Sequence, residues 1–177
     1  MKIAVFCGSS IPSNKDYIAS AQRLGVMIAQ GGHTLVYGGS NLGIMGAISG
    51  AVLSSGGKVI GVIPTIFSEE IILSQPETEL VRVKSMAERK EYIIAESDAF
   101  IALPGGIGTL DEVLEVLVAN QLGQVDKPIG LYNPDGFYND LLHQIEVMGN
   151  NGFYRSGKAP RLLYSDNICK LLELVIG

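Results

Sequence analysis

Three glycine-rich stretches in this chain each follow a short apolar run, where backbone amides could reach a bound anion. They are Gly8-Ser9-Ser10, Gly38-Gly39-Ser40-Asn41 and Pro104-Gly105-Gly106-Ile107-Gly108-Thr109. Glycine allows close approach of the backbone, and the start of a helix favours negative charge. We interpret the third stretch as a phosphate cradle without a basic residue, to which Thr109 adds a hydroxyl. For the first stretch alone, an ordinary tight turn is the simpler interpretation.

The glycine stretches match neither common nucleotide fingerprint. No Gly-Lys-Ser/Thr follows the third stretch, so a P-loop nucleotide hydrolase would lack its central cation. The first stretch lacks the G-x-G-x-x-G spacing, and no acidic residue follows the second apolar run, which ends in Gly38-Gly39. NAD and FAD are therefore disfavoured.

Two ionisable residues are placed to act on a ligand in this cradle. Arg89 is expected in the first turn of a helix that begins near Met86, where a cation opposes the helix dipole. The alternative is a solvated arginine paired with Glu88 or Glu91. Glu112 lies one turn into the helix that follows the cradle, which directs its carboxylate toward the bound anion. Its alternative is a solvated glutamate, the role also expected for the neighbouring acidic residues of that helix.

The other reactive side chains form no recognisable site. His33 follows a Gly-Gly helix stop and His143 falls in a late helix, so both are interpreted as structural or solvated. Cys7 and Cys169 are the only cysteines and lack metal-ligand spacing, which favours free, buried thiols. We expect no metal site and no Ser-His-Asp triad.

Alternation of short β-branched runs with longer helical stretches predicts βαβ units in one α/β domain. About seven strands are expected, in a mostly parallel sheet with helices on both faces. The strands are expected at residues 3–7, 34–37, 59–63, 80–83, 99–103, 129–132 and 162–164. Helices are expected from a Ser13 cap to Gly31-Gly32, and near residues 43–55, 86–97, 108–122, 136–149 and 166–175.

Two of these helices bear on assembly. Residues 42–57 include no charged residue, and only Glu115 is polar between Val113 and Ala119. The strongest apolar stripe of the latter helix is expected at Leu110, Val113, Leu114 and Leu117. A helix that is apolar nearly all round needs cover on more than one side. We therefore predict a homodimer, with a monomer that has extra internal packing as the alternative.

Composition narrows the function classes. The chain is 47% hydrophobic and 18% charged, with a net charge of −5 and a pI near 5.0. This charge, without basic residues interleaved with aromatics, disfavours nucleic-acid binding. The apolar stretch at residues 3–7 is too short for a signal peptide or a membrane span, so we expect a cytoplasmic protein.

Several segments together resemble the Lonely Guy family of cytokinin riboside 5′-monophosphate phosphoribohydrolases, long mislabelled as lysine decarboxylases. Residues 104–112 are similar to its PGGxGTxxE motif, and residues 86–90 to its Met-x-x-Arg-Lys segment. Residues 6–10, 37–39 and 43–46 are similar to its other glycine segments. The resemblance covers essentially the whole chain, in order and with compatible spacing.

This resemblance implies a three-layer modified Rossmann fold, a homodimer with sites near the subunit interface, and no metal or organic cofactor. The implied reaction splits an adenosine 5′-monophosphate, with or without an isoprenoid group on its amine, into base and ribose 5-phosphate. The implied catalytic residues are Arg89 and Glu112. Substrate-binding residues are expected at Gly8, Ser9, Gly39, Glu70, Met86, Lys90, Gly105, Gly106, Gly108 and Thr109.

The chain departs from the family pattern near the expected base pocket. Ile107 replaces a frequent tyrosine, and Val118-Ala119 stands where Thr-Trp is common, so plain AMP rivals an isoprenoid nucleotide as substrate. Rival classes are a nucleotide or cofactor carrier of the same fold, a pyridoxal phosphate decarboxylase, and an NAD oxidoreductase. A carrier would need the cradle but would have no use for Arg89 and Glu112.

Overall fold

A seven-stranded parallel sheet forms the centre of the computed structural model, which describes residues 1–67, 78–154 and 161–177. The strands are β1 (Lys2–Phe6), β2 (Thr34–Tyr37), β3 (Lys58–Pro64), β4 (Thr78–Val83), β5 (Ala99–Ala102), β6 (Ile129–Tyr132) and β7 (Leu163–Ser165). Their order across the sheet is β4-β3-β2-β1-β5-β6-β7, and each described pair is parallel. The predicted α/β class is confirmed.

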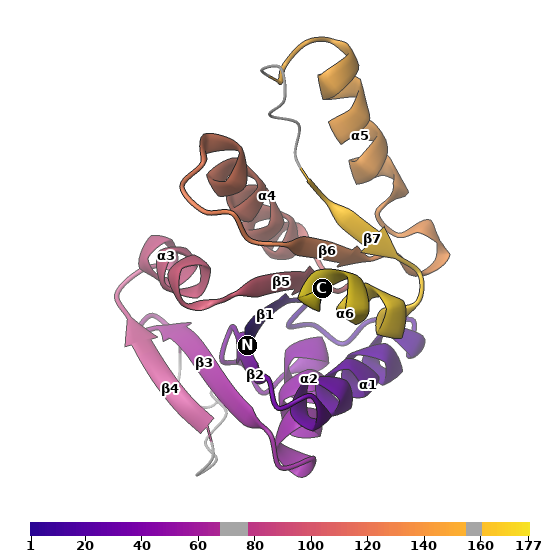
Figure 1. The fold of residues 1–177 in the computed structure, drawn as a ribbon. Coiled ribbons are helices and arrows are strands. Elements are labelled where there is room, and N and C mark those ends of the chain that lie inside the picture. Colours follow the sequence, from indigo (N-terminus) through magenta and orange to yellow (C-terminus); the bar gives the residue numbers. More distant parts are fainter. Residues whose placement is uncertain (68–77, 155–160) are drawn as a thin grey trace.

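Six α-helices of the described ranges cover the two faces of the sheet (Figure 1). They are α1 (Asp16–Gln30), α2 (Gly43–Ser54), α3 (Met86–Glu96), α4 (Ile107–Leu122), α5 (Asn139–Asn150) and α6 (Ile168–Ile176). Alternate side chains of β1 pack on opposite faces of the sheet, since successive strand side chains point to opposite sides. Ile3 and Val5 pack with α1, α2 and α6, while Ala4 and Phe6 belong to the core under α3, α4 and α5. The result is the predicted three-layer arrangement.

The strand order reverses between β1 and β5, and this is where the sheet offers a ligand site. From β1 the chain builds outward through β2, β3 and β4, and it then returns to β5 on the other side of β1. Phe6 is in register with Ala102, so the loops that follow these two strands leave the sheet together. Ligands of open α/β sheets bind in the crevice outside such a switch point.

The start of α1 differs from the prediction. The helix begins at Asp16 with Lys15 at its N-cap position, so the proposed Ser13 cap is wrong. Asn14 provides the acceptor instead, because its Oδ1 accepts a hydrogen bond from the Asp16 amide at 2.9 Å. At the other end, Gly32 adopts the left-handed conformation that was expected of the helix stop, with φ of 68°.

The buried face of α4 also differs from the predicted stripe. Leu114 is 45% exposed, whereas Val113 and Leu117 are buried as expected. The buried positions include Thr109, Glu112 and Val116, which follow the three- and four-residue spacing of one helix face. Glu112 therefore lies on the inward side of α4, and the interpretation of a solvated glutamate is wrong.

The uncharged helix α2 finds its second cover within the chain. A side chain at Gly25 of α1 would come within 2.7 Å of the Ile48 carbonyl oxygen and 2.9 Å of Ala51 Cβ. The absence of a side chain at this glycine thus lets the two helices approach closely. Packing against α1 therefore covers part of α2 within the chain.

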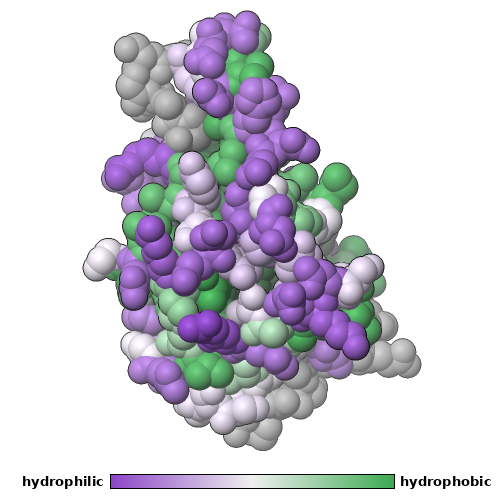
Figure 2. All heavy atoms as spheres, turned by 90° about the vertical axis from the view of Figure 1, so that its right-hand side faces the viewer, coloured by the Kyte–Doolittle hydropathy of each residue, from purple (hydrophilic) through white to green (hydrophobic). Residues whose placement is uncertain are grey.

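The molecular face over α5 and the neighbouring C-terminal elements is mostly hydrophilic, with hydrophobic side chains in small groups (Figure 2). Helix α5 forms the projection at the top of this view. In the three described ranges, no helix combines the length and apolar character that crossing a bilayer requires.

Candidate active site

The glycine loops after β1 and β5 contact one another at the switch point. A Cβ at Gly105 would overlap Thr109 Oγ1 and would lie 3.0 Å from the Gly8 amide nitrogen. A Cβ at Gly8 would lie 3.7 Å from the Gly105 Cα. Only glycine at position 105 permits this approach, so the two loops form one continuous backbone surface.

Helix α4 begins at the same place. Its N-cap residue, Gly106, is extended, and no side chain in the described ranges accepts a hydrogen bond from the first turn as a cap. The first amides of a helix have no intrahelical acceptor, and the helix dipole makes this end favourable for an anion. Thr109 is 3% exposed and lies in this first turn. The geometry is that of an anion site built from backbone amides.

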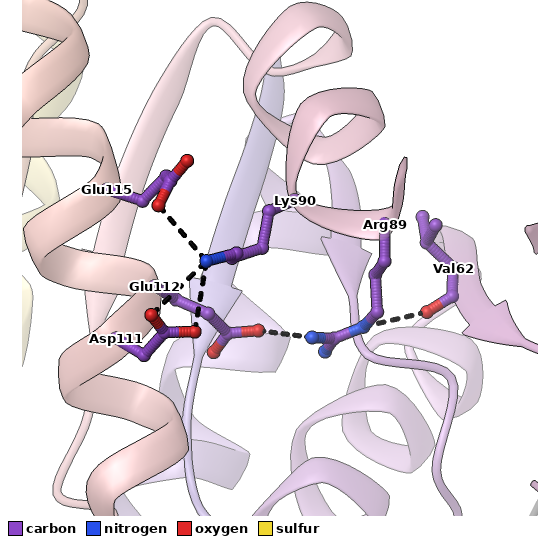
Figure 3. Close-up of polar contacts among 6 residues, drawn as sticks. All are labelled: Val62, Arg89, Lys90, Asp111, Glu112 and Glu115. Atoms are coloured by element: carbon purple, nitrogen blue, oxygen red, sulfur yellow. Dashed lines mark hydrogen bonds and ion pairs between the residues drawn. The ribbon is translucent and has the colours of Figure 1, made fainter. Parts of the chain in front are cut away.

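Arg89 reaches this region from the first turn of α3. The Ser85 side chain caps α3 by accepting a hydrogen bond from the Glu88 amide at 3.1 Å, and Arg89 follows one residue later. Its Nε donates to the Val62 carbonyl at 3.1 Å, and its guanidinium lies so close to Gly38 that a Cβ there would clash with Nη2. Figure 3 shows the side chain directed toward Glu112 of α4.

Glu112 of α4 forms an ion pair with the Arg89 guanidinium, on the side away from the Val62 carbonyl. Arg89 Nη1 donates to Glu112 Oε1 at 2.6 Å, and the two side chains are only 7% and 6% exposed (Figure 3). The alternative pairing of Arg89 with Glu88 or Glu91 is therefore wrong. Desolvation makes a buried pair of this kind costly to form, so the pair is weak evidence for a stabilising role.

Burial raises the pKa of the Glu112 carboxyl above its usual range. Arg89 opposes this shift through its charge and its hydrogen bond, while Asp111 adds to it and Lys90 opposes it. The net direction is upward, which moves the carboxyl toward the pKa of a base that works near neutral pH. Burial also raises the pKa of the Cys7 thiol, so this neighbour remains a neutral thiol.

A cavity of about 520 Å³ brings most of the predicted site residues together. Those that line it are Gly8, Ser9, Met86, Arg89, Gly105, Gly106, Gly108, Thr109 and Glu112. A cavity of this size is suited to a small organic ligand. Its polar side chains include serines of the glycine loops, Arg89 of α3, and Thr109 and Glu112 of α4.

Among the described residues, two predicted binding residues, Gly39 and Lys90, are not part of this lining. Gly39 has a left-handed φ of 79°, and its neighbours Gly38 and Ser40 line the cavity in its place. Lys90 is occupied elsewhere, with Nζ 3.2 Å from Asp111 and 3.0 Å from Glu115 (Figure 3). Glu70 lies outside the described residues.

The apolar wall of the cavity was not predicted from the sequence. Tyr17 of α1 and Phe137, which follows β6, pack edge to face with ring centroids 5.9 Å apart, and both line the cavity. Further apolar lining comes from Leu42, Ile44, Met45, Ile63 and Phe67. No local motif marks Tyr17 or Phe137, because the two residues come from segments far apart in the chain.

The residues present do not fit a pyridoxal phosphate site. That cofactor is held through a lysine Schiff base, and the cavity lining, as far as the structure describes it, includes no lysine. In the same part of the chain, no cluster of three His, Cys, Asp or Glu side chains is arranged to hold a metal. The polar groups that the cavity does offer are backbone amides, hydroxyls, one guanidinium and one carboxylate.

Comparison with known proteins identifies the family. A family model described as "possible lysine decarboxylase" matches residues 45–175. The "probable cytokinin riboside 5′-monophosphate phosphoribohydrolase LOGL6" of Oryza sativa subsp. japonica is 48% identical, over 97% of this chain and 69% of its own. The "cytokinin riboside 5′-monophosphate phosphoribohydrolase LOG2" of Arabidopsis thaliana is 40% identical, over 98% of this chain and 82% of its own. The chain belongs to the Lonely Guy family.

Membership of the Lonely Guy family confirms the resemblance seen in the sequence. The fold extends beyond the family. The molybdenum cofactor binding protein of the phototrophic bacterium Rippkaea orientalis superposes with a TM-score of 0.73 at 26% identity, over 99% of this chain and 94% of that protein. The same architecture therefore also occurs in a protein named for binding a cofactor.

Proposed function

We propose that this Lonely Guy protein hydrolyses the N-glycosidic bond of AMP or of an isoprenoid (cytokinin) derivative of AMP, releasing the free base and ribose 5-phosphate. The observation that carries the proposal is the buried pair of Arg89 and Glu112, in the same cavity as the glycine cradle. The names of the relatives at 40% and 48% identity support the same reaction.

The cradle accounts for recognition of the 5′-phosphate. Amides at the start of α4 and the Thr109 hydroxyl bind the phosphate, with the adjoining loop of Gly8 and Ser9 on the other side. Binding energy from the phosphate, which does not itself react, then positions the ribose over Glu112, one turn further along α4. No basic residue is needed at the phosphate.

Glu112 and Arg89 account for the chemistry. As the bond between C1′ and the base nitrogen breaks, its electron pair goes to the base, and the ribose acquires oxocarbenium character. The Glu112 carboxylate stabilises this charge and takes a proton from the attacking water, whose oxygen bonds to C1′. The departing base gains a proton, which balances the reaction. Arg89 holds the carboxylate in place, because its planar guanidinium donates to Val62 and Glu112 at once.

The apolar wall accounts for the base. Tyr17, Phe137 and Met86 offer flat or flexible surfaces to a purine and to any isoprenoid group it carries. Plain AMP and prenylated AMP both remain candidate substrates, since both present the same phosphate and ribose to the cradle.

We also propose that the protein functions as a homodimer through α4. Ile107, Leu114, Val118 and Leu122 are exposed apolar residues, and their spacing of seven, four and four residues places them on one side of the helix. A second copy of this chain would cover such a stripe through a two-fold, self-complementary contact. Because the stripe begins at the cradle, the interface would lie beside the cavity.

The experiment that tests the function is incubation of the pure protein with AMP and with isopentenyladenosine monophosphate. The reaction predicts free base and ribose 5-phosphate in equal amounts. Nucleotide that is bound but intact would instead favour a carrier, the second class that this fold supports. An absence of both binding and products would remove the proposal altogether.

A further inference from the structure

Lys90 bridges the two helices that carry the proposed catalytic residues. It follows Arg89 in α3, and its Nζ lies 3.2 Å from Asp111 and 3.0 Å from Glu115 of α4. The lysine side chain is only 18% exposed, whereas its two acidic partners are about half exposed. This ammonium therefore sits partly buried between two carboxylates on the outer side of the site.

The bridge lies at the same level as the buried ion pair. Glu112 stands between Asp111 and Glu115 in sequence, and Arg89 and Lys90 are adjacent, so one turn of α3 contacts one stretch of α4 twice (Figure 3). Neighbouring helix residues point about 100° apart, so one contact lies inside and the other outside. Together the two contacts restrain how far apart and how rotated the helices are.

We infer that Lys90 is a positioning residue, which holds the first turn of α3 against α4 so that Arg89 meets Glu112 in the geometry that hydrolysis requires. This role replaces the substrate contact expected for Lys90 from the sequence, and it rests on the proposed function. A displacement of about 1 Å at a reacting group is enough to cost about 10²-fold in rate. The outer bridge therefore matters to the chemistry although Lys90 does not line the cavity.

The chain contains a matched control for this bridge. Lys127, beyond the far end of α4, donates from Nζ to the Ile94 and Ala95 carbonyls of α3 at 2.7 and 3.0 Å. Asn120 of α4 fixes the Lys127 backbone through two hydrogen bonds. Lys127 thus joins the same two helices at the end remote from Arg89 and Glu112. Replacing Lys127 therefore measures how much activity and stability are lost when the contact between α3 and α4 is weakened away from the site.

The kinetic test compares Lys90→Met, Lys90→Arg, Asp111→Asn/Glu115→Gln and Lys127→Met. Lys90→Met is expected to lower kcat by about tenfold, which is about 1.4 kcal/mol, with KM changed less than about twofold. Lys90→Arg restores most of this loss, and the double variant reproduces it although Lys90 remains available to substrate. Lys127→Met lowers the melting temperature with kcat unchanged. A rise in KM alone, or an equal loss of kcat in Lys127→Met, would overturn the inference.

A second measurement is independent of turnover, so it separates failure of this inference from failure of the proposed function. Carbon-13 NMR titration gives the pKa of Glu112, which is influenced by Arg89 and Lys90 from α3 and by Asp111 on its own helix, while the neighbouring Cys7 stays a neutral thiol. Loss of the Asp111 charge alone lowers this pKa. If Asp111→Asn/Glu115→Gln loosens the Arg89 contact, the pKa rises instead. An unchanged or lower value in that variant refutes the positioning role even if no nucleotide is hydrolysed.

Discussion

Arg89 Nη1 and Glu112 Oε1 lie 2.6 Å apart in an environment that leaves less than a tenth of either side chain exposed. The two residues come from different helices, and the carboxylate has no charge partner of comparable proximity among the described residues. A lone buried pair contributes little net stability, because desolvation offsets the attraction between its charges. The pair lies in the same cavity as the glycine loops and the start of α4, where we propose that the phosphate binds.

Glu112→Gln is expected to abolish most turnover while phosphate binding persists. The amide keeps the shape of the side chain and an acceptor for Arg89, but it cannot take a proton from water. Loss of a general base costs about 10²–10⁴-fold in rate, which initial-rate assays of ribose 5-phosphate would detect. Isothermal titration calorimetry with AMP should give a Kd within about threefold of wild type, since the cradle is unaltered.

The matched control for that variant is Glu146→Gln. Glu146 lies on α5 with a side chain 70% exposed, and we expect its replacement to leave both rate and affinity unchanged. Full activity in Glu112→Gln would remove the carboxylate from the mechanism.

The sequence predicts the loops around Arg89 and Glu112 better than it predicts the contact between these two side chains. Glycine spacing located the cradle, and strand and helix patterns placed it at the carboxyl edge of a parallel sheet. The hydrophobic pattern does not predict that Glu112 is buried, because it places Leu114 on the buried face of α4, and Leu114 is exposed. A glutamate is almost never fully buried unless a partner neutralises its charge, and the partner of Glu112 is Arg89, which belongs to another helix.

The aromatic part of the cavity illustrates the same limit. Tyr17 and Phe137 meet at 5.9 Å across the fold, and neither belongs to a motif. The expected cap at Ser13 fails for a local reason, because Asn14 supplies the acceptor for the first turn of α1. Sequence reasoning thus recovered features fixed by backbone geometry and missed those created by tertiary packing.

The pH profile should report the raised pKa of Glu112. A base acts in its ionised form, so activity falls as the pH drops through this pKa. Because burial shifts the pKa upward, the acid limb of kcat is expected above the ordinary glutamate value of about 4.3. Measuring kcat at saturating AMP across pH 4–8 would locate the limb.

The substrate phosphate also titrates, with a second pKa near 6, so the limb needs an independent assignment. Direct titration of Glu112 by carbon-13 NMR in the free protein should give a value above about 4.3. The residual activity of Glu112→Gln should lack the limb. A Glu112 pKa at or below the ordinary value would contradict the burial argument.

Gly105→Ala should weaken phosphate binding. Its Cβ would overlap Thr109 Oγ1 and approach the Gly8 amide nitrogen to 3.0 Å, so the two loops must separate. Overpacking of this kind costs about 1–3 kcal/mol. If this cost destabilises the AMP complex rather than the free protein, KM for AMP rises by about 5- to 150-fold. Gly50→Ala is the control, since its Cβ meets no atom within 4 Å in the described chain. An unchanged KM in Gly105→Ala would move the phosphate site elsewhere.

Val118→Asp should convert the proposed dimer to a monomer. Val118 lies at the middle of the apolar stripe on α4 and is 51% exposed, so a carboxylate there would be buried without a partner in the two-fold contact. Light scattering should give about twice the chain mass of 18.8 kDa for wild type and the chain mass for the variant. Phe153→Asp, at a residue 77% exposed beyond α5, should remain dimeric. A wild-type protein that runs as a monomer at micromolar concentration would leave the exposed stripe of α4 to some other partner.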